Sequence, residues 1–250
     1  MRVLVTRASD DAQRTARELA RRGHEAIVAP LSEIRIIENP QPDLADVQAI
    51  LATSSNGIRA FASRCARRDI PLFAVGDNSA ETARSAGFGH VTSANGDSSA
   101  LAATVCKCLS PAEGALLHVT GRRSSKGLHV QVANAGFSCR VWELYDAVPT
   151  GVLPDHVLAD FGRGTIDAVL VLSPGSGRNL VKAFKGARLE ARCAQMLACS
   201  ISKEAAAALA DIQFGAIRIA EKPSLDAVLA LLDSEIAVRQ RAGFARGERA

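Results

Sequence analysis

Residues 3–7 (VLVTR) form a short apolar run near the start of the chain, and residues 117–121 (LHVTG) repeat its pattern in the second half. Each run is followed by a helix-like stretch that ends at a glycine, Gly23 in the first half and Gly136 in the second. A long internal repeat of this kind indicates a duplicated structural unit. The sequence therefore predicts two similar halves.

The repeat continues through two further pairs of segments. Residues 51–59 (LATSSNGIR) are echoed by 171–178 (VLSPGSGR), and residues 74–80 (AVGDNSA) are echoed by 198–205 (ACSISKEA). Strand-helix units thus follow one another in the same order twice. This order favours two similar domains with a ligand-binding cleft between them.

Short apolar runs alternate with longer amphipathic runs along the chain. The apolar runs, such as 49–53 and 168–172, are continuous, which is typical of parallel strands buried on both faces. Between the runs, residues such as Ala12, Ala16 and Leu19 recur at helical spacing. The pattern predicts an α/β protein with parallel sheets covered by helices.

Two extended-looking segments, 30–37 and 141–149, interrupt this alternation at matching places in the two repeats. If both cross between the domains, they form a paired connector and each domain mixes the two repeats. The first domain then consists of residues 1–35 plus 149–235, and the second of residues 36–148. From the repeat alone, consecutive domains divided near Ala112 also fit.

The composition argues against two classes of partner. Aromatic residues make up 4% of the chain, with one tryptophan, Trp142, and one tyrosine, Tyr145, so neither a base-stacking surface nor a membrane belt is indicated. No apolar run approaches the ~18 residues that span a bilayer, and a strand-like run directly follows Arg2 where a signal peptide would have its core. We expect a soluble, cytoplasmic monomer that binds neither nucleic acid nor a membrane.

The formal net charge is +4, and much of the positive excess lies in residues 236–250, where arginines stand among alanine and glycine. This composition predicts a basic, disordered tail. The mildly basic remainder suits an anionic ligand.

Known motifs for metals and cofactors are missing. The six cysteines include no CxxC pair, and Cys106 and Cys108 would point to different faces of a helix. No GxGxxG, GxxxxGK[ST], HExxH or GxSxG motif occurs. The sequence therefore predicts neither a metal nor a cofactor.

Small and hydroxyl residues fill four strand-to-helix turns: 53–56 (TSSN), 76–79 (GDNS), 173–176 (SPGS) and 200–202 (SIS). In open α/β sheets such turns lie at the carboxyl ends of the strands, where ligands bind. A helix N-terminus there offers free N–H groups to an anion, and each charge-assisted hydrogen bond contributes about 1.5–3 kcal/mol. Any single serine is better explained as the cap of its own helix. The four turns together favour a site for a polycarboxylate.

The candidate ligand-binding residues share a position just after a strand or in the first turn of a helix: Thr6, Arg7, Thr53, Ser54, Ser55, Asn56, Gly76, Asn78, Ser79, Gly121, Arg122, Ser173, Gly175, Ser176, Ser200 and Ser202. Arg123 follows the same strand as Arg122. His118 lies inside an apolar run and is interpreted as a core histidine. Tyr145 stands in a connector segment, where its phenol is either packed or able to donate a proton into the cleft.

At these residues the chain resembles the uroporphyrinogen-III synthase family, over about residues 1–235. The resemblance rests on the order and spacing of segments rather than on one motif: 5–7 (VTR), 53–57 (TSSNG) leading to Phe61, 75–80 (VGDNSA), 141–145 (VWELY), 172–176 (LSPGS), 200–202 (SIS) and 223–224 (PS). It implies two flavodoxin-like (Rossmann-like) parallel-sheet domains joined by a two-stranded connector, which favours the interleaved division of the chain.

The resemblance also implies a reaction without a cofactor. The family's substrate is the linear tetrapyrrole hydroxymethylbilane, which loses its terminal hydroxyl as water and closes, through a spirocyclic pyrrolenine, with inversion of the last pyrrole ring. Tyr145 falls on the family's connector tyrosine, the candidate proton donor. Ser79 falls where relatives have threonine, and residues 201–205 (ISKEA) replace the usual Gly-Pro-Thr-Thr-Ala, so that Ser202 supplies a hydroxyl beside Glu204.

Two alternatives come from other classes. One is a non-catalytic two-domain protein that binds an anionic small molecule. The other is a sugar-phosphate or nucleotide enzyme on the same kind of scaffold, which the missing glycine motifs disfavour.

Overall fold

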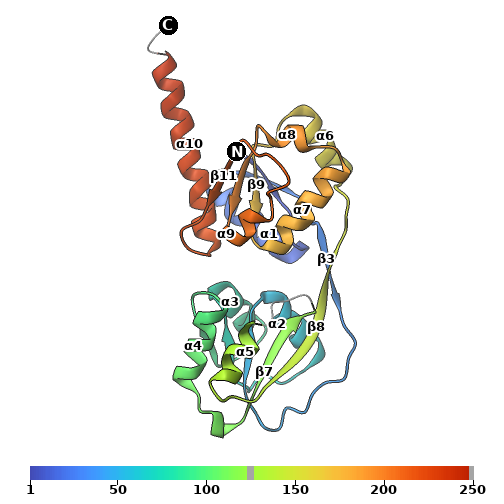
Figure 1. Ribbon diagram of the computed structural model, residues 1–250, viewed down its shortest axis with the longest axis vertical. Helices are drawn as coiled ribbons and strands as arrows, with labels where there is room; N and C mark the ends of the chain where they lie inside the picture. The colour runs from blue at the N-terminus through green and yellow to red at the C-terminus, as the bar shows by residue number, and fades with distance from the viewer. Residues whose placement is uncertain (123–126, 248–250) are drawn as a thin grey trace. The chain divides into compact units, whose positions relative to one another are not determined.

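The computed structural model describes residues 1–122 and 127–247, which divide into two compact units (Figure 1). Unit 1 contains Met1–Glu33 and Val148–Ala250, and unit 2 contains Ile34–Ala147. The chain passes from one unit to the other within strand β3 (Ser32–Ile36) and again within strand β8 (Cys139–Pro149). Unit 1 is therefore built from two separate stretches of chain.

Unit 1 contains a five-stranded sheet in the order β11-β10-β9-β1-β2. All its neighbouring strands pair in parallel: β1 (Arg2–Val5), β2 (Glu25–Val28), β9 (Ala168–Val171), β10 (Leu197–Ser200) and β11 (Ala216–Ile219). From β1 the chain moves to β2 on one side, and from β9 it moves to β10 on the other. The topological switch point of this sheet thus lies between β1 and β9.

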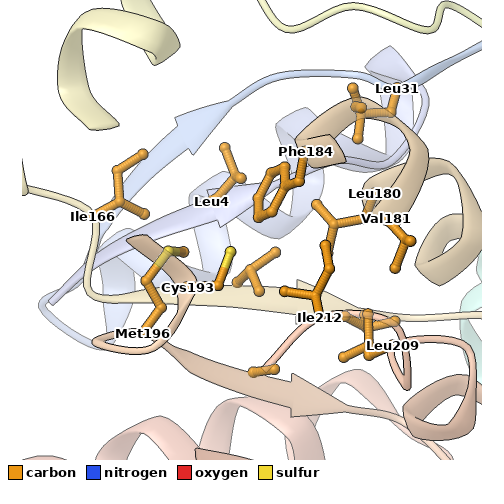
Figure 2. Packing of buried hydrophobic residues seen from close by; sticks show 14 of the residues in the cluster. Leu4, Leu31, Ile166, Leu180, Val181, Phe184, Cys193, Met196, Leu209 and Ile212 are labelled. Atoms are coloured by element: carbon orange, nitrogen blue, oxygen red, sulfur yellow. The ribbon is translucent and has the colours of Figure 1, made fainter. Parts of the chain in front are cut away.

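Helices cover both faces of this sheet because successive side chains of a strand point to opposite sides. Leu4 faces α6 (Asp155–Arg163), α7 (Pro174–Gly186) and α9 (Lys203–Ala207), and Figure 2 shows it beside Phe184 of α7. Val3 and Val5 face α1 (Ser9–Arg21) and α10 (Leu225–Gly247). The short helix α8 (Glu190–Cys193) adds Cys193 to the core around Leu4.

Unit 2 contains a six-stranded sheet in the order β3-β8-β7-β4-β5-β6. The strands β4 (Val47–Ala52), β5 (Leu72–Ala74), β6 (Val91–Ser93), β7 (Ala115–Gly121) and β8 form parallel pairs. Helices α2 (Ser55–Arg64) and α3 (Asp77–Ser85) pack on one face, and α4 (Ser98–Cys108) and α5 (Gly127–Asn134) on the other. The 3₁₀ turn η1 (Pro111–Glu113) leads into β7, and the switch point lies between β4 and β7.

The sequence repeat explains the likeness of the two sheets. Strands β1 and β2 of the first repeat correspond to β7 and β8 of the second, and β4, β5 and β6 correspond to β9, β10 and β11. With β3 of the six-stranded sheet left aside, each sheet takes two strands from one repeat and three from the other, in the same spatial order. The prediction of an α/β protein with parallel sheets is confirmed.

One local prediction differs from the structure. Residues 236–250 are predicted from composition to be disordered, but α10 continues through Gly247, and 248–250 lie outside the described residues. The reason is that alanine and arginine, with four residues each in this segment, are strong helix formers. The segment 141–149, by contrast, is extended as predicted and forms most of the long strand β8.

Candidate functional site

The hydroxyl-rich turns lie at the carboxyl edges of the two sheets, because paired parallel strands end at the same edge. In unit 2 the turn 53–56 follows β4, and Gly121 ends β7, so these residues flank the switch point of that sheet. In unit 1 the turn 173–176 follows β9, and Thr6 follows β1, so they flank the corresponding switch point. Ligands of open α/β sheets bind at such points.

Tyr145 lies over the end of β7 in unit 2. It pairs with Gly121 where the register of β7 and β8 shifts, and the N–H of Arg122 donates to its carbonyl oxygen at 2.9 Å. A side chain at Gly121 would place its Cβ 2.7 Å from the Cζ atom of the Tyr145 ring, so glycine makes room for the ring. The tyrosine is only 7% exposed, and the residues packed around it hold the ring in place.

The Tyr145 hydroxyl lies 2.9 Å from the Oγ atom of Ser54. Ser54 is the N-cap of α2, with an extended backbone, and its Oγ accepts a hydrogen bond from the N–H of Gly57 at 3.1 Å. Gly57 lets α2 approach β7, since a Cβ there would lie 2.9 Å from the Val119 carbonyl oxygen. Close packing of α2 on β7 thus brings the cap and the phenol together.

The other polar residues of this turn make different contacts. The hydroxyls of Thr82 in α3 and of the buried Ser55 are hydrogen-bonded at 3.0 Å, and this bond joins α2 to α3. Asn56 accepts a hydrogen bond from Arg59 at 2.7 Å, along the same helix, and Thr53 is half-buried. Thr82 is not among the binding residues predicted from the sequence. The one sequence feature that points to it is its position four residues after Asn78, one helical turn along α3.

The turn after β5 is open at its first residue. A Cβ at Gly76, the N-cap of α3, would meet nothing within 4 Å. The side-chain oxygen of Asn78 is buried and has no hydrogen-bond partner among the residues that the structure describes. Ser79 is buried, and Asp77 places a negative charge in the same first turn.

In unit 1 the turn after β9 is closed by its own serines. Ser173, the N-cap of α7, accepts from the N–H of Ser176 at 3.0 Å, and Ser176 Oγ accepts from the N–H of Ser173 at 3.1 Å. This reciprocal pair is a capping box, with Pro174 in the first turn. Both serines and Gly175 remain accessible at the edge of the sheet.

The remaining candidates of unit 1 are tied to local partners. Arg7 forms an ion pair with Asp11 at 2.9 Å, one helical turn ahead, and Thr6 is buried. The buried Ser200 donates to the carbonyl oxygen of Ser202 at 2.9 Å.

Ser202 caps the short helix α9 through the N–H of Ala205. A hydrogen bond from Ser202 lowers the pKa of the neighbouring Glu204 carboxyl below its usual value. Glu204 places a negative charge in the first turn of α9, as Asp77 does in the first turn of α3, and such a charge disfavours an anion there.

Two further residues fit simple structural roles. Arg122 is exposed, with its Nε atom 3.7 Å from Glu143, whereas Arg123 lies outside the described residues. His118 is buried in β7, and burial, with a smaller contribution from His129, lowers its pKa to about 4. It is therefore neutral at pH 7, as befits a core histidine.

Within residues 1–122 and 127–247, no group of three histidine, cysteine, aspartate or glutamate side chains comes together as a metal site. No helix in the same part of the chain is long and apolar enough to span a membrane.

Comparison with known proteins gives three findings. The family model for uroporphyrinogen-III synthase HemD (HEM4) matches residues 13–230. Uroporphyrinogen-III synthetase from Helicobacter pylori has a similar structure, with a TM-score of 0.58 at 17% identity over 94% of this chain and 99% of that chain. A mutant uroporphyrinogen III synthase from the extremely thermophilic bacterium Thermus thermophilus gives a TM-score of 0.53 at 16% identity, over 95% of this chain and 99% of that chain.

The search of curated proteins found no match. At these identities the two structures support the fold, and the family model carries the assignment. Because that model matches residues 13–230, most of the sequence, the chain belongs to the uroporphyrinogen-III synthase family.

Proposed function

We propose that this chain closes hydroxymethylbilane into uroporphyrinogen III, with loss of water and inversion of the terminal pyrrole ring, and that Tyr145 is its proton donor. Members of the family are cyclising hydro-lyases that act on this substrate. The observation that carries the residue assignment is the 2.9 Å contact between the Tyr145 hydroxyl and Ser54, beside the switch point of unit 2.

The first chemical step needs an acid. Hydroxide is a poor leaving group, so a proton from Tyr145 lets the terminal hydroxyl depart as water while the pyrrole nitrogen lone pair forms the azafulvene cation. The substituted carbon of the last ring then attacks and forms the spirocyclic pyrrolenine. Opening and reclosure invert that ring, and the proton lost when it regains aromaticity restores the acid. The sum is one substrate to one product and one water.

We further propose that the acetate and propionate groups of the substrate contact the hydroxyl-rich turns that follow the strands. The first-turn N–H groups of α2, α3 and α7 suit carboxylates because the positive ends of the helix dipoles lie there. The first turns of α2 and α7 hold no acidic side chain, whereas the first turn of α3 holds Asp77. The binding residues in this proposal are those that follow a strand: Thr6, Arg7, Thr53, Ser54, Ser55, Asn56, Gly76, Asn78, Ser79, Gly121, Arg122, Ser173, Gly175, Ser176, Ser200 and Ser202.

For the architecture, we propose two flavodoxin-like domains with β3 and β8 as the two-stranded connector. Counted along the chain, the unit 1 sheet has the order 2-1-3-4-5, the order of flavodoxin-like folds. Without β3, the unit 2 sheet has the strand order β8-β7-β4-β5-β6, in which the equivalent strands take the same places. Because both sheets hold equivalent strands at equivalent places, the flavodoxin-like description applies to both domains.

The test is cyclisation of hydroxymethylbilane by the purified full chain, with the product isomers separated by chromatography. We expect the type III isomer. A product dominated by the type I isomer, which forms without an enzyme, would refute the proposed reaction. Tight binding of the substrate without turnover would instead identify a binding protein.

A further inference from the structure

We propose that Ser54 is a positioning residue for the proton transfer: its hydroxyl donates to the phenol oxygen of Tyr145 and so leaves the phenol proton free for the substrate. This inference rests on the proposed role of Tyr145. It assigns to Ser54 a task that neither helix capping nor substrate binding requires.

The hydrogen bonds of Ser54 favour this direction. A serine hydroxyl has one proton and two lone pairs, and one lone pair of Ser54 Oγ accepts from the N–H of Gly57 at 3.1 Å. In the described part of the chain, the only acceptor within reach of the Ser54 proton is the Tyr145 hydroxyl, at 2.9 Å. Accepting a bond from the N-terminus of α2 polarises the Ser54 O–H group and makes it a better donor.

The rest of the tyrosine is already fixed by the fold. Its ring covers Gly121, its carbonyl oxygen accepts from the N–H of Arg122, and the residue is 7% exposed. The remaining freedom is the rotation of the phenol O–H bond. Donation from Ser54 occupies one side of the phenol oxygen, and the proton is then directed away from Ser54.

The test uses a double-mutant cycle in the full chain, with kcat and KM measured separately for hydroxymethylbilane. We expect Ser54→Ala to lower kcat about tenfold with little change in KM, as for the loss of one hydrogen bond in the transition state. Tyr145→Phe is expected to lower kcat by about 100-fold or more. When Tyr145→Phe is already present, adding Ser54→Ala should lower kcat no further. In the chain that keeps Tyr145, Ser54→Thr should give a kcat near that of the parent.

A spectroscopic readout separates positioning from a merely structural effect. The chain has one tyrosine, so labelling with ¹³C at Cζ gives a single signal that reports the hydrogen bonding of Tyr145. Ser54→Ala should shift this signal, and Ser54→Thr should return it. If the turnover of the Tyr145→Phe variant is too low to detect, the Cζ signal and the kcat of Ser54→Thr show whether Ser54 positions the phenol.

Ser224→Ala is the matched control for loss of a cap. Ser224 also accepts from the N–H three residues ahead, that of Ala227, at the start of α10, but it is not among the candidate site residues. This variant should lose stability and keep its kcat.

Two results would overturn the inference. One is that Ser54→Ala lowers kcat by the same factor in the parent chain and in the Tyr145→Phe variant. The other is that Ser54→Ala leaves the Cζ signal of Tyr145 unchanged. The proposed role of Tyr145 fails separately, if Tyr145→Phe keeps full turnover. The proposed reaction fails if the parent chain yields the type I isomer.

Discussion

The switch points of the two sheets are built from equivalent strands but carry different side chains. In unit 2, Gly121 ends β7 and leaves room for Tyr145, whose hydroxyl meets the cap of α2. In unit 1 the equivalent strand end carries Arg7, which pairs with Asp11. The end of β7 thus has no side chain at Gly121 and leaves room for a phenol, whereas the equivalent position in unit 1 carries the charged side chain of Arg7.

The same contrast extends to the caps and to the neighbouring strand. Ser173 makes its hydrogen bonds with Ser176, whereas Ser54 reaches Tyr145. In the ladder, Val5 pairs with Val28 and the equivalent Val119 pairs with Trp142, so Leu31 stands where Tyr145 stands in unit 2. Leu31 is 1% exposed in an apolar core. A duplicated backbone therefore gave two similar edges, only one of which carries a phenol.

The largest effect is expected from Gly121→Val, which fills the space that unit 2 keeps clear. Its Cβ would lie 2.7 Å from the Tyr145 ring, so the ring must move. We expect kcat to fall by roughly 10²–10⁴-fold, because the displaced phenol no longer acts as the acid, and the free energy of unfolding to fall by about 1–3 kcal/mol as well. Turnover assays and denaturant unfolding measure both.

A matched glycine variant controls for the change of residue type. A Cβ at Gly162 of α6 meets nothing within 4 Å, so Gly162→Ala should raise the free energy of unfolding by about 0.5–1 kcal/mol and leave kcat unchanged. Full activity of Gly121→Val would show that the ring position does not matter.

Next in size is Tyr145→Leu, which gives unit 2 the residue of unit 1. Loss of the phenol should lower kcat by roughly 10²–10⁴-fold, because a general acid contributes that much. The far-UV circular dichroism spectrum should stay unchanged.

The converse exchange, Leu31→Tyr, buries a hydroxyl in the apolar core of unit 1. It should lower the free energy of unfolding by about 1–3 kcal/mol without creating a second acid. If Tyr145→Leu keeps the turnover of the parent chain, the phenol that distinguishes the edge of unit 2 from that of unit 1 has no role in catalysis.

A smaller effect is expected from Ser173→Ala, which opens the capping box of α7. We expect a loss of about 0.5–2 kcal/mol in the free energy of unfolding. KM should rise while kcat stays near its parent value, opposite to the pattern of Ser54→Ala. A fall in kcat alone would place Ser173 in the chemistry and make the two caps alike.

The smallest effect is expected from Arg7→Ala. The arginine is bound to Asp11 at 2.9 Å in an i,i+4 pair, and such pairs contribute about 0.3–0.5 kcal/mol. Thermal unfolding should change little, and KM should rise by no more than about threefold, equivalent to less than about 1 kcal/mol, because the ion pair with Asp11 makes Arg7 a minor contact in the proposed binding site. A large rise in KM would show that Arg7 leaves Asp11 to bind the substrate.

The sequence located the strands and turns but not the contact between Ser54 and Tyr145. Ser54 and Ser173 were recognisable as caps because a serine before a helix satisfies its free N–H groups. The sequence predicts Gly121 as a ligand-binding residue but does not show that it also lies beneath the Tyr145 ring. That contact depends on the register shift between Thr120 and Gly121, which arises from pairing with β8 and leaves no local pattern.

The interleaving of the chain also bears on its synthesis. Strand β1 finds one neighbour, β2, nearby in sequence, but its other neighbour, β9, emerges from the ribosome much later, and the contact from Arg2 to Asp167 spans 165 positions. The stretch Ile34–Ala147 is translated in between and is continuous. We therefore expect co-translational folding to complete unit 2 first, while the nascent N-terminal segment of unit 1 waits with an exposed strand edge for its partner.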